Sequence, residues 1–322
     1  MSNRLRWPIA LATVCGMAAG IWTLGVVGLS ALVEAAARLG AGGFAALCTM
    51  SLALMAVLGA AWLAVLPAAG VDRLGLFAWA RTAREASSDI LPFAQLGGLV
   101  VGSRTLTAAG LPAVPVYASM IVDLTTEMGS QAVVTLFGMV VLAGRLAAGN
   151  EAAANGVWIG AAIGIVTLAS FAALQRPLLS MGAAMLGKLA PDMDLPLAAL
   201  RAELDGIYAR RGRITVSLAL NLAGWLMSAG IGWATLAMMG TAVPFGRMLA
   251  LESLIFAVRT AAFAIPGAIG VQEAAYLLLA GLFGIDPHAA VALSLVKRAR
   301  DVAIGVPALI AWQAREWRPR TA

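Results

Sequence analysis

Residues 39–71 read LGAGGFAALCTMSLALMAVLGAAWLAVLPAAGV, thirty-three positions without a charged side chain. A helix needs about 20 apolar residues to cross the hydrocarbon core of a bilayer, so this stretch is long enough to span one. The whole chain agrees, because 61% of its 322 residues are hydrophobic and only 12% are charged. So few charges cannot cover a water-facing surface of this size. The sequence therefore predicts an all-α polytopic membrane protein and excludes an ordinary soluble domain.

Five further stretches are predicted to cross the membrane, which gives about six spanning helices in a single integral membrane domain, 1–322. The predicted spans are 7–33, 39–71, 113–142, 152–175, 214–246 and 288–312. The first apolar run is too long for a signal peptide and no clear cleavage site follows it, so it is assigned as a transmembrane helix.

The positions of the cations predict the orientation. Six crossings from a cytoplasmic N-terminus place fifteen Lys and Arg residues inside, Arg81 and Arg84 among them. Only Arg38, Arg145 and Arg247 then lie outside, and this bias favours both termini in the cytoplasm. The net charge of +6 is thus explained by topology, and no nucleic-acid partner is predicted. Two cysteines in apolar runs predict neither a disulfide framework nor a zinc site.

Two segments, 74–110 and 248–285, are too short and too broken by Gly to be simple spans. Their landmarks repeat at a constant offset, from Pro92 to Pro266 (266 − 92 = 174) and from Gly110 to Gly284 (284 − 110 = 174). The alternative is coincidence in a chain rich in Gly and Ala. Three crossings separate the copies, so a true repeat would be inverted, an architecture in which broken helices form a substrate site. We predict two re-entrant helical hairpins in half one (about 1–150) and half two (about 214–322), joined by a cytoplasmic connector, 176–213.

The connector ends in a stretch, 197–213, that reads as a helix with a basic end. It is interpreted as a surface-lying connector. The alternative is an amphipathic element that senses anionic lipid through Arg210, Arg211 and Arg213.

Nine ionisable residues fall at membrane depth. Each would cost at least ~2.5–3.5 kcal/mol at the bilayer centre, so they are expected to face inward and pair. The nine are Asp123, Glu127, Glu252, Arg259, Glu273, Lys297, Arg298, Arg300 and Asp301. Asp123, Glu127 and Gln131 share one face of a helix because they are four residues apart. The cluster either glues helices together or forms a path for a polar group. In the second case, neutralising Asp123 or Lys297 should abolish transport and leave protein abundance intact.

Three stretches carry a family resemblance: SMIVDLTTEMGSQ (119–131), IPGAIGVQEAA (265–275) and LSLVKRARDVAIGVPALIAWQ (293–313). They resemble the flippase-like, lysylphosphatidylglycerol synthase transmembrane-region family, and the last also resembles its branch associated with hopanoid biosynthesis. The likeness covers essentially the whole chain.

The resemblance implies a bacterial inner-membrane protein that moves or handles a hopanoid or related amphiphilic lipid. Possible further partners are proteins of hopanoid biosynthesis or transport. Aminoacyl transfer is not expected, because family members owe it to an additional soluble domain that this chain does not show. The residues expected to bind substrate are Asp123, Glu127, Gln131, Arg259, Pro266, Gly267, Gly270, Glu273, Lys297, Arg298, Arg300 and Asp301.

Two other functions remain open from the sequence. The first is an intramembrane lipid-modifying enzyme, for which Asp123 and Glu127 could act as an acid–base couple. The chain shows no recognisable hydrolase motif, and its one histidine, His288, is expected at a surface turn. The second is an accessory scaffold. We therefore predict a transporter with no catalytic residue, cofactor or metal.

Overall fold

The computed structural model describes residues 29–66, 69–90, 94–147, 155–160, 162, 197–262 and 268–317. The described chain is helical and contains no strand within these ranges. Three of its helices are long and apolar enough to cross a membrane, at Ala37–Val65, Ala113–Ala147 and Arg211–Met238. Helices satisfy all their backbone hydrogen bonds internally, as a lipid environment requires. The fold class is therefore that of a polytopic α-helical membrane protein. Most of the predicted spans 7–33 and 152–175 lies outside the described residues.

The helices follow one order twice along the chain. The first set is α2 (Leu29–Val65), α3 (Leu74–Ile90), α4 (Ala94–Ala108) and α5 (Ala113–Ala147). The second set is α8 (Arg211–Met238), α9 (Phe245–Ala261), α10 (Val271–Ala280) and α11 (Pro287–Trp317). Short 3-10 turns, η1 (Val71–Arg73) and η3 (Gly281–Phe283), and the helix α7 (Leu197–Ala209) complete the arrangement.

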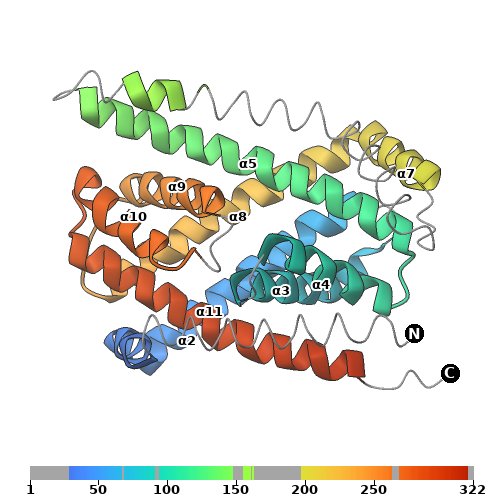
Figure 1. Ribbon diagram of the computed structural model, residues 1–322, viewed down its shortest axis with the longest axis horizontal. Helices are drawn as coiled ribbons and strands as arrows, with labels where there is room; N and C mark the ends of the chain where they lie inside the picture. Colours follow the sequence, from blue (N-terminus) through green and yellow to red (C-terminus); the bar gives the residue numbers. More distant parts are fainter. Residues whose placement is uncertain are drawn as a thin grey trace.

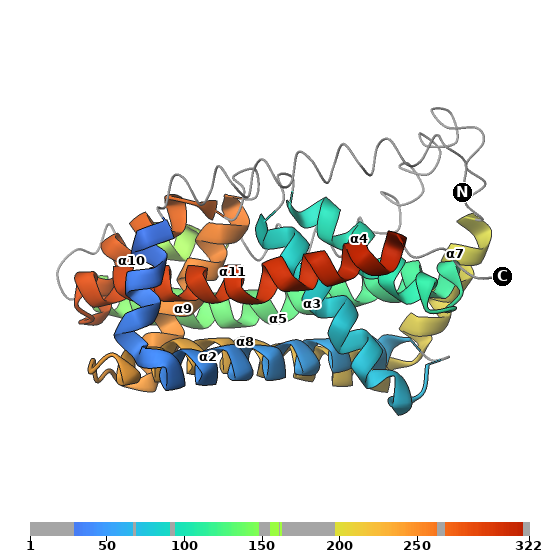
Figure 2. The same ribbon diagram turned by 90° about the horizontal axis from the view of Figure 1, so that it is seen from below.

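The two sets run in opposite directions. α2 and α8 lie side by side and antiparallel, and α5 and α11 flank them, also antiparallel to each other (Figures 1 and 2). Each long helix reaches into the other half, because α5 packs against α9 and α11 packs against α3. The helix pairs α3–α4 and α9–α10, at the predicted hairpins, therefore lie on opposite sides of the α2–α8 pair. Whether these pairs re-enter the membrane stays a prediction.

The turns that precede the long helices have the same backbone conformation in both halves. Gly110 has φ +91° and Gly284 has φ +68°, values that favour glycine. α5 and α11 each begin three residues later. Proline at the first position of α11 suits a helix start, and Asp286 Oδ2 accepts a hydrogen bond from the Ala289 N–H at 2.9 Å. The common turn explains why these two glycines repeat at a fixed offset.

Two boundaries differ from the prediction. α2 is continuous across the predicted break between the first two spans and bends at Gly40, where φ is +68°. The basic stretch is also divided differently, because α7 ends at Ala209 and Arg211 already begins α8. The basic residues Arg211 and Arg213 thus belong to a long apolar helix rather than to the end of the connector.

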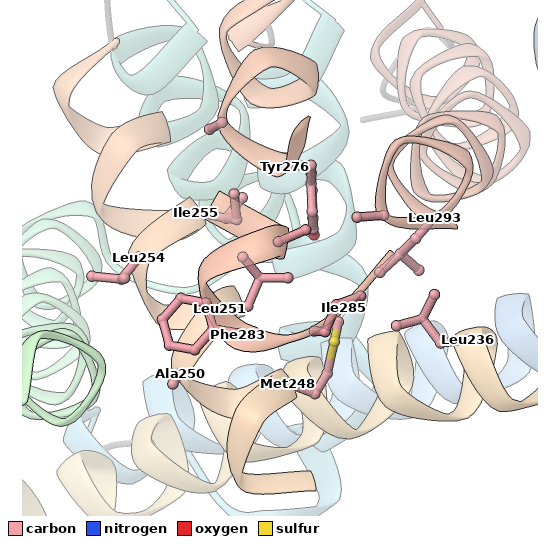
Figure 3. Packing of buried hydrophobic residues seen from close by; sticks show 13 residues of the cluster. Leu236, Met248, Ala250, Leu251, Leu254, Ile255, Tyr276, Phe283, Ile285 and Leu293 are labelled. Atoms are coloured by element: carbon pink, nitrogen blue, oxygen red, sulfur yellow. The ribbon is translucent and has the colours of Figure 1, made fainter. Parts of the chain in front are cut away.

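Each half has its own hydrophobic core. In half two, Leu251, Ile255, Tyr276, Phe283 and Leu293 pack between α9, α10 and α11 (Figure 3). In half one, a second core packs α2, α3, α4 and α5 together, with these buried members: Trp62, Phe77, Ala80, Leu106, Val116 and Val122. The cores leave a polar region between the halves, where the charged residues gather.

Candidate functional site

Two arginines of α3 and two carboxylates of α5 form a buried charge cluster in half one, here called the α3–α5 cluster (Arg81, Arg84, Asp123 and Glu127). Glu127 contacts both guanidinium groups: its Oε2 lies 3.0 Å from Arg81 Nη1 and 2.9 Å from Arg84 Nη2, and its Oε1 also accepts from Arg81 Nη2. Asp123 Oδ2 lies 3.2 Å from Arg84 Nη1 and 3.5 Å from Arg81 Nη1. Helical spacing brings each pair onto one face of its helix. The cluster joins α3 to α5 by charge-assisted hydrogen bonds.

The positions of Arg81 and Arg84 correct the sequence analysis, which counted both among the cytoplasmic cations. Their exposed fractions are 1% and 4%. A cation close to the membrane surface in sequence looks the same whether it enters water or a protein interior. The signal that could have found them is their spacing on α3, whose residues 81, 84 and 85 form one charged face opposite the charged face of α5.

A second group of ion pairs lies in half two, on α9, α10 and α11. Lys297 Nζ lies 2.6 Å from Glu252 Oε2 and 3.0 Å from the Tyr276 hydroxyl, which donates to Glu252 Oε1 at 2.5 Å. All three side chains are buried. Arg298 Nη2 lies 3.1 Å from Glu273 Oε1. The membrane-depth charges therefore do face inward and pair.

Arg300 and Asp301 are neighbours on α11 and contact each other, with Arg300 Nε 3.0 Å from Asp301 Oδ1. Arg300 Nη1 also lies 3.4 Å from Ser51 Oγ of α2. These contacts place the pair beside α2, at the boundary between the two halves.

A cavity of about 550 Å³ lies between the halves. Its charged walls come from α3, α5, α9 and α11, as Arg81, Arg84, Glu85, Glu127, Arg259, Arg300 and Asp301. Aromatic and apolar walls are supplied by Trp225, Phe256, Leu58, Met55 and Met128. The rings of Trp225 and Phe256 pack edge to face, 4.5 Å between centroids. One space thus offers both ionic groups and apolar surface, which suits an amphiphilic ligand.

The predicted site residues are divided by this cavity. The structure brings together Glu127, Gln131, Arg259, Arg300 and Asp301 on its walls. Outside the lining lie Asp123 and Lys297, which are buried, and the pair Glu273 and Arg298. Gly270 is a backbone element of the α10 start, and its N–H donates to Glu273 Oε2 at 2.8 Å. Pro266 and Gly267 lie outside the described residues. Sequence reasoning missed the lining residues Arg81, Arg84, Glu85, Trp225 and Thr260.

Hydroxyl and amide groups connect α5 to α8 and α9 next to the cavity. Thr126 Oγ1 lies 2.9 Å from Ser217 Oγ and accepts a hydrogen bond from Asn221 Nδ2 at 3.1 Å. The Trp225 indole donates to Ser130 Oγ at 3.0 Å. Residues 217, 221 and 225 are four apart, a spacing that could have indicated this face of α8. Gln131 Nε2 donates to Thr260 Oγ1 at 2.7 Å, so α5 and α9 meet directly at the cavity wall.

The fold and the site define a class of protein, a helical membrane protein with a buried charged cavity between two antiparallel halves. Residues 9–308 match the model of the family described as the lysylphosphatidylglycerol synthase TM region. The chain belongs to this family and is a membrane lipid-related protein. Neither a curated protein nor a solved structure matches it. The resemblance seen in the sequence is therefore confirmed at the level of the family, and the hopanoid branch stays a proposal.

Proposed function

We propose that this protein moves an amphiphilic lipid, a hopanoid or a related molecule, across the bacterial inner membrane in the manner of a flippase. The headgroup passes through the charged cavity between the two halves, and the apolar part stays with the aliphatic walls. No chemical step on the lipid is part of the proposal. The observation that carries it is the cavity itself, whose ionic walls come from equivalent helices of both halves.

The packing of the helices supports movement rather than static binding. The two halves meet at the cavity through contacts between side chains, such as Gln131 with Thr260. The polypeptide joins them between α5 and α7, far from the cavity lining. A relative shift of the halves would therefore change access to the cavity without breaking a helix, as in transporters built from inverted repeats.

The charge distribution supports an orientation with the start of α8 in the cytoplasm. Arg73, which follows α2, and Arg210, Arg211 and Arg213, which surround the start of α8, lie at one end of the molecule. Arg213 Nη1 donates to the Ala64 carbonyl at 3.3 Å, which ties the two helix ends together. The opposite end holds Arg145 and Arg247, where α5 ends and α9 begins. The larger group of cations is expected on the cytoplasmic side, together with both termini.

The experiment is lipid analysis of a deletion strain, with inner and outer membranes separated and total hopanoid measured independently. Transport predicts normal total hopanoid with a changed distribution between membranes, restored by the wild-type protein. A missing lipid with accumulation of its precursor would instead indicate an intramembrane enzyme. Unchanged amount and distribution of every lipid would contradict the proposal and favour a scaffold.

A further inference from the structure

The carboxyl group of Asp123 is the buried charge in half one whose surroundings differ most from those of its neighbours. Its exposed fraction is 0%, and its Oδ1 has no hydrogen-bond donor among the described residues. Both arginine contacts fall on the other oxygen, Oδ2, at 3.2 and 3.5 Å. Glu127 contacts the same arginines with both of its oxygens, at 2.9 and 3.0 Å and through one further contact. Asp123 is thus held weakly and on one side, and Glu127 strongly on both.

Counting charge in the same region gives an excess of one carboxylate. Arg81 and Arg84 provide two positive charges, whereas Asp123, Glu127 and Glu85 provide three carboxyl groups. Glu85 Oε1 lies 2.8 Å from Arg81 Nη2 and occupies part of that guanidinium. A buried net charge is costly in a protein interior. Charge balance is reached when one of the three carboxyl groups carries a proton.

The remaining neighbours do not supply the missing cation. On α8, the packed helix beside Asp123, the adjacent group is the neutral amide of Asn221, whose own Oδ1 is buried without a donor among the described residues. The charged groups of the other elements around the cavity are Arg259 of α9 and the Arg300–Asp301 pair of α11, and these residues line the cavity whereas Asp123 does not. A proton on Asp123 adds a donor in a place where two buried acceptors lack one.

We propose that Asp123 holds a proton in this arrangement and exchanges it when Glu127 leaves the two arginines. Once Glu127 moves into the cavity, Arg81 and Arg84 have Asp123 as their remaining partner on α5, which then ionises. The Asp123 O–H bond breaks, an O–H bond forms on the displaced Glu127, and Glu127 passes the proton to water in the cavity. One proton is released for each displacement of Glu127. This step rests on the proposed function for its purpose, since it would couple lipid movement to a proton gradient.

The proton itself can be measured without transport, by infrared absorption of the non-ionised carboxyl group in purified protein at neutral pH, with the shift in D2O as identification. The wild-type protein should show this band, and Asp123→Asn should lose it. Glu127→Gln should lose it as well, although Asp123 is intact, because both arginines then pair with Asp123. Glu273→Gln, a matched carboxylate of half two, should keep it.

The absence of the band from the wild type, or its persistence in Asp123→Asn, would overturn the proton site. Its persistence in Glu127→Gln would overturn the exchange. If Asp123→Asn does not fold, Asn221→Ala keeps the carboxyl group and removes its amide neighbour. The band should then shift, and an unshifted band would overturn the assignment. An unchanged lipid distribution in the deletion strain removes the proposed function but leaves the band, so the two failures are distinguishable.

Discussion

Lys297 and Glu252 form a buried ion pair in half two at the place where half one has Asp123 and Arg81, with the two charges exchanged. Lys297 follows Asp123 by 174 residues (297 − 123), which is also the offset between the starts of α11 and α5 (287 − 113). Glu252 follows Arg81 by 171 residues (252 − 81), the offset between α9 and α3 (245 − 74). Both halves therefore bind their hairpin helix to their long helix by an ion pair at equivalent positions.

The pair in half two is predicted to be structural. Lys297→Met should destabilise the protein by about 3–5 kcal/mol, because it leaves Glu252 buried without its cation. The double variant Lys297→Met with Glu252→Gln removes both charges and should recover most of this loss. Thermal unfolding in detergent, with protein abundance in the membrane, measures the effect. The exposed pair Arg38–Glu34 is the control, since Arg38→Met should change stability by less than about 1 kcal/mol.

This expectation departs from the one drawn from sequence, in which neutralising Lys297 spares abundance and abolishes transport. The reason is that Tyr276 and Glu252 surround the ammonium group completely and the cavity does not reach it. Intact abundance in Lys297→Met, together with lost transport, would restore the earlier expectation and contradict the structural role.

Arg81 and Arg84 are predicted to be required for transport in a way that lysine cannot replace. Each guanidinium bridges Asp123 and Glu127 through two different nitrogens, a geometry that a single ammonium group does not provide. Arg84→Lys should lower transport by about tenfold or more, because loss of one hydrogen bond between charged groups costs ~1.5–3 kcal/mol. The measurement is restoration of the lipid distribution in the deletion strain. Arg73→Lys, on the exposed turn η1, should restore it fully, and equal activity of the two variants would argue against a role for the bridge.

Close packing of α2 on α3 is predicted to depend on Gly59. A Cβ atom at this position would lie 2.6 Å from the backbone nitrogen of Ala78, which cannot move aside like a side-chain end. Gly59→Ala should therefore lower the free energy of unfolding by about 1–3 kcal/mol. Gly42→Ala in the same helix meets nothing within 4 Å and should be neutral or stabilising by up to ~1 kcal/mol. Equal thermal stability of the two variants would show that α2 and α3 are not packed as described.

Movement of α5 relative to α9 is predicted to be necessary for transport. Gln131 and Thr260 lie on the cavity wall and are joined by a 2.7 Å hydrogen bond. In a background without Cys15 and Cys48, cysteines at positions 131 and 260 should be linked by a short thiol-reactive cross-linker. Linked protein should lose most of its transport in reconstituted vesicles, whereas each single-cysteine variant treated in the same way should keep it. Full activity after linking would contradict a mechanism in which the halves shift.

Much of the fold was accessible from sequence because it depends on local features. Apolar run length predicted the spans at 113–142 and 214–246, and α5 and α8 lie there. The glycines before the long helices were found by spacing alone, since a positive φ angle restricts the residue type wherever the turn is used. Both signals act within a few residues of the chain, and neither requires knowledge of a distant partner.

The site was only partly accessible because it depends on which distant side chains meet. Sequence analysis placed Glu127 and Arg300 in one functional cluster, and both line the cavity. It did not connect Arg81 or Arg84 to Asp123, because partners some forty residues apart are chosen by the packing of α3 on α5. It also grouped Lys297 with the lining residues, because residues on one helix can face either a core or a cavity.

The sequence by itself determined that this is a helical membrane protein and which charges require burial, because the cost of a charge in hydrocarbon applies wherever the chain folds. Tertiary structure alone decided how those charges are used. It seals Lys297 with Glu252 and Tyr276, and it leaves Glu127 between two arginines at the edge of a cavity. The difference is physical, since burial depends on the composition of a segment, whereas pairing and access depend on the relative positions of helices distant in the chain.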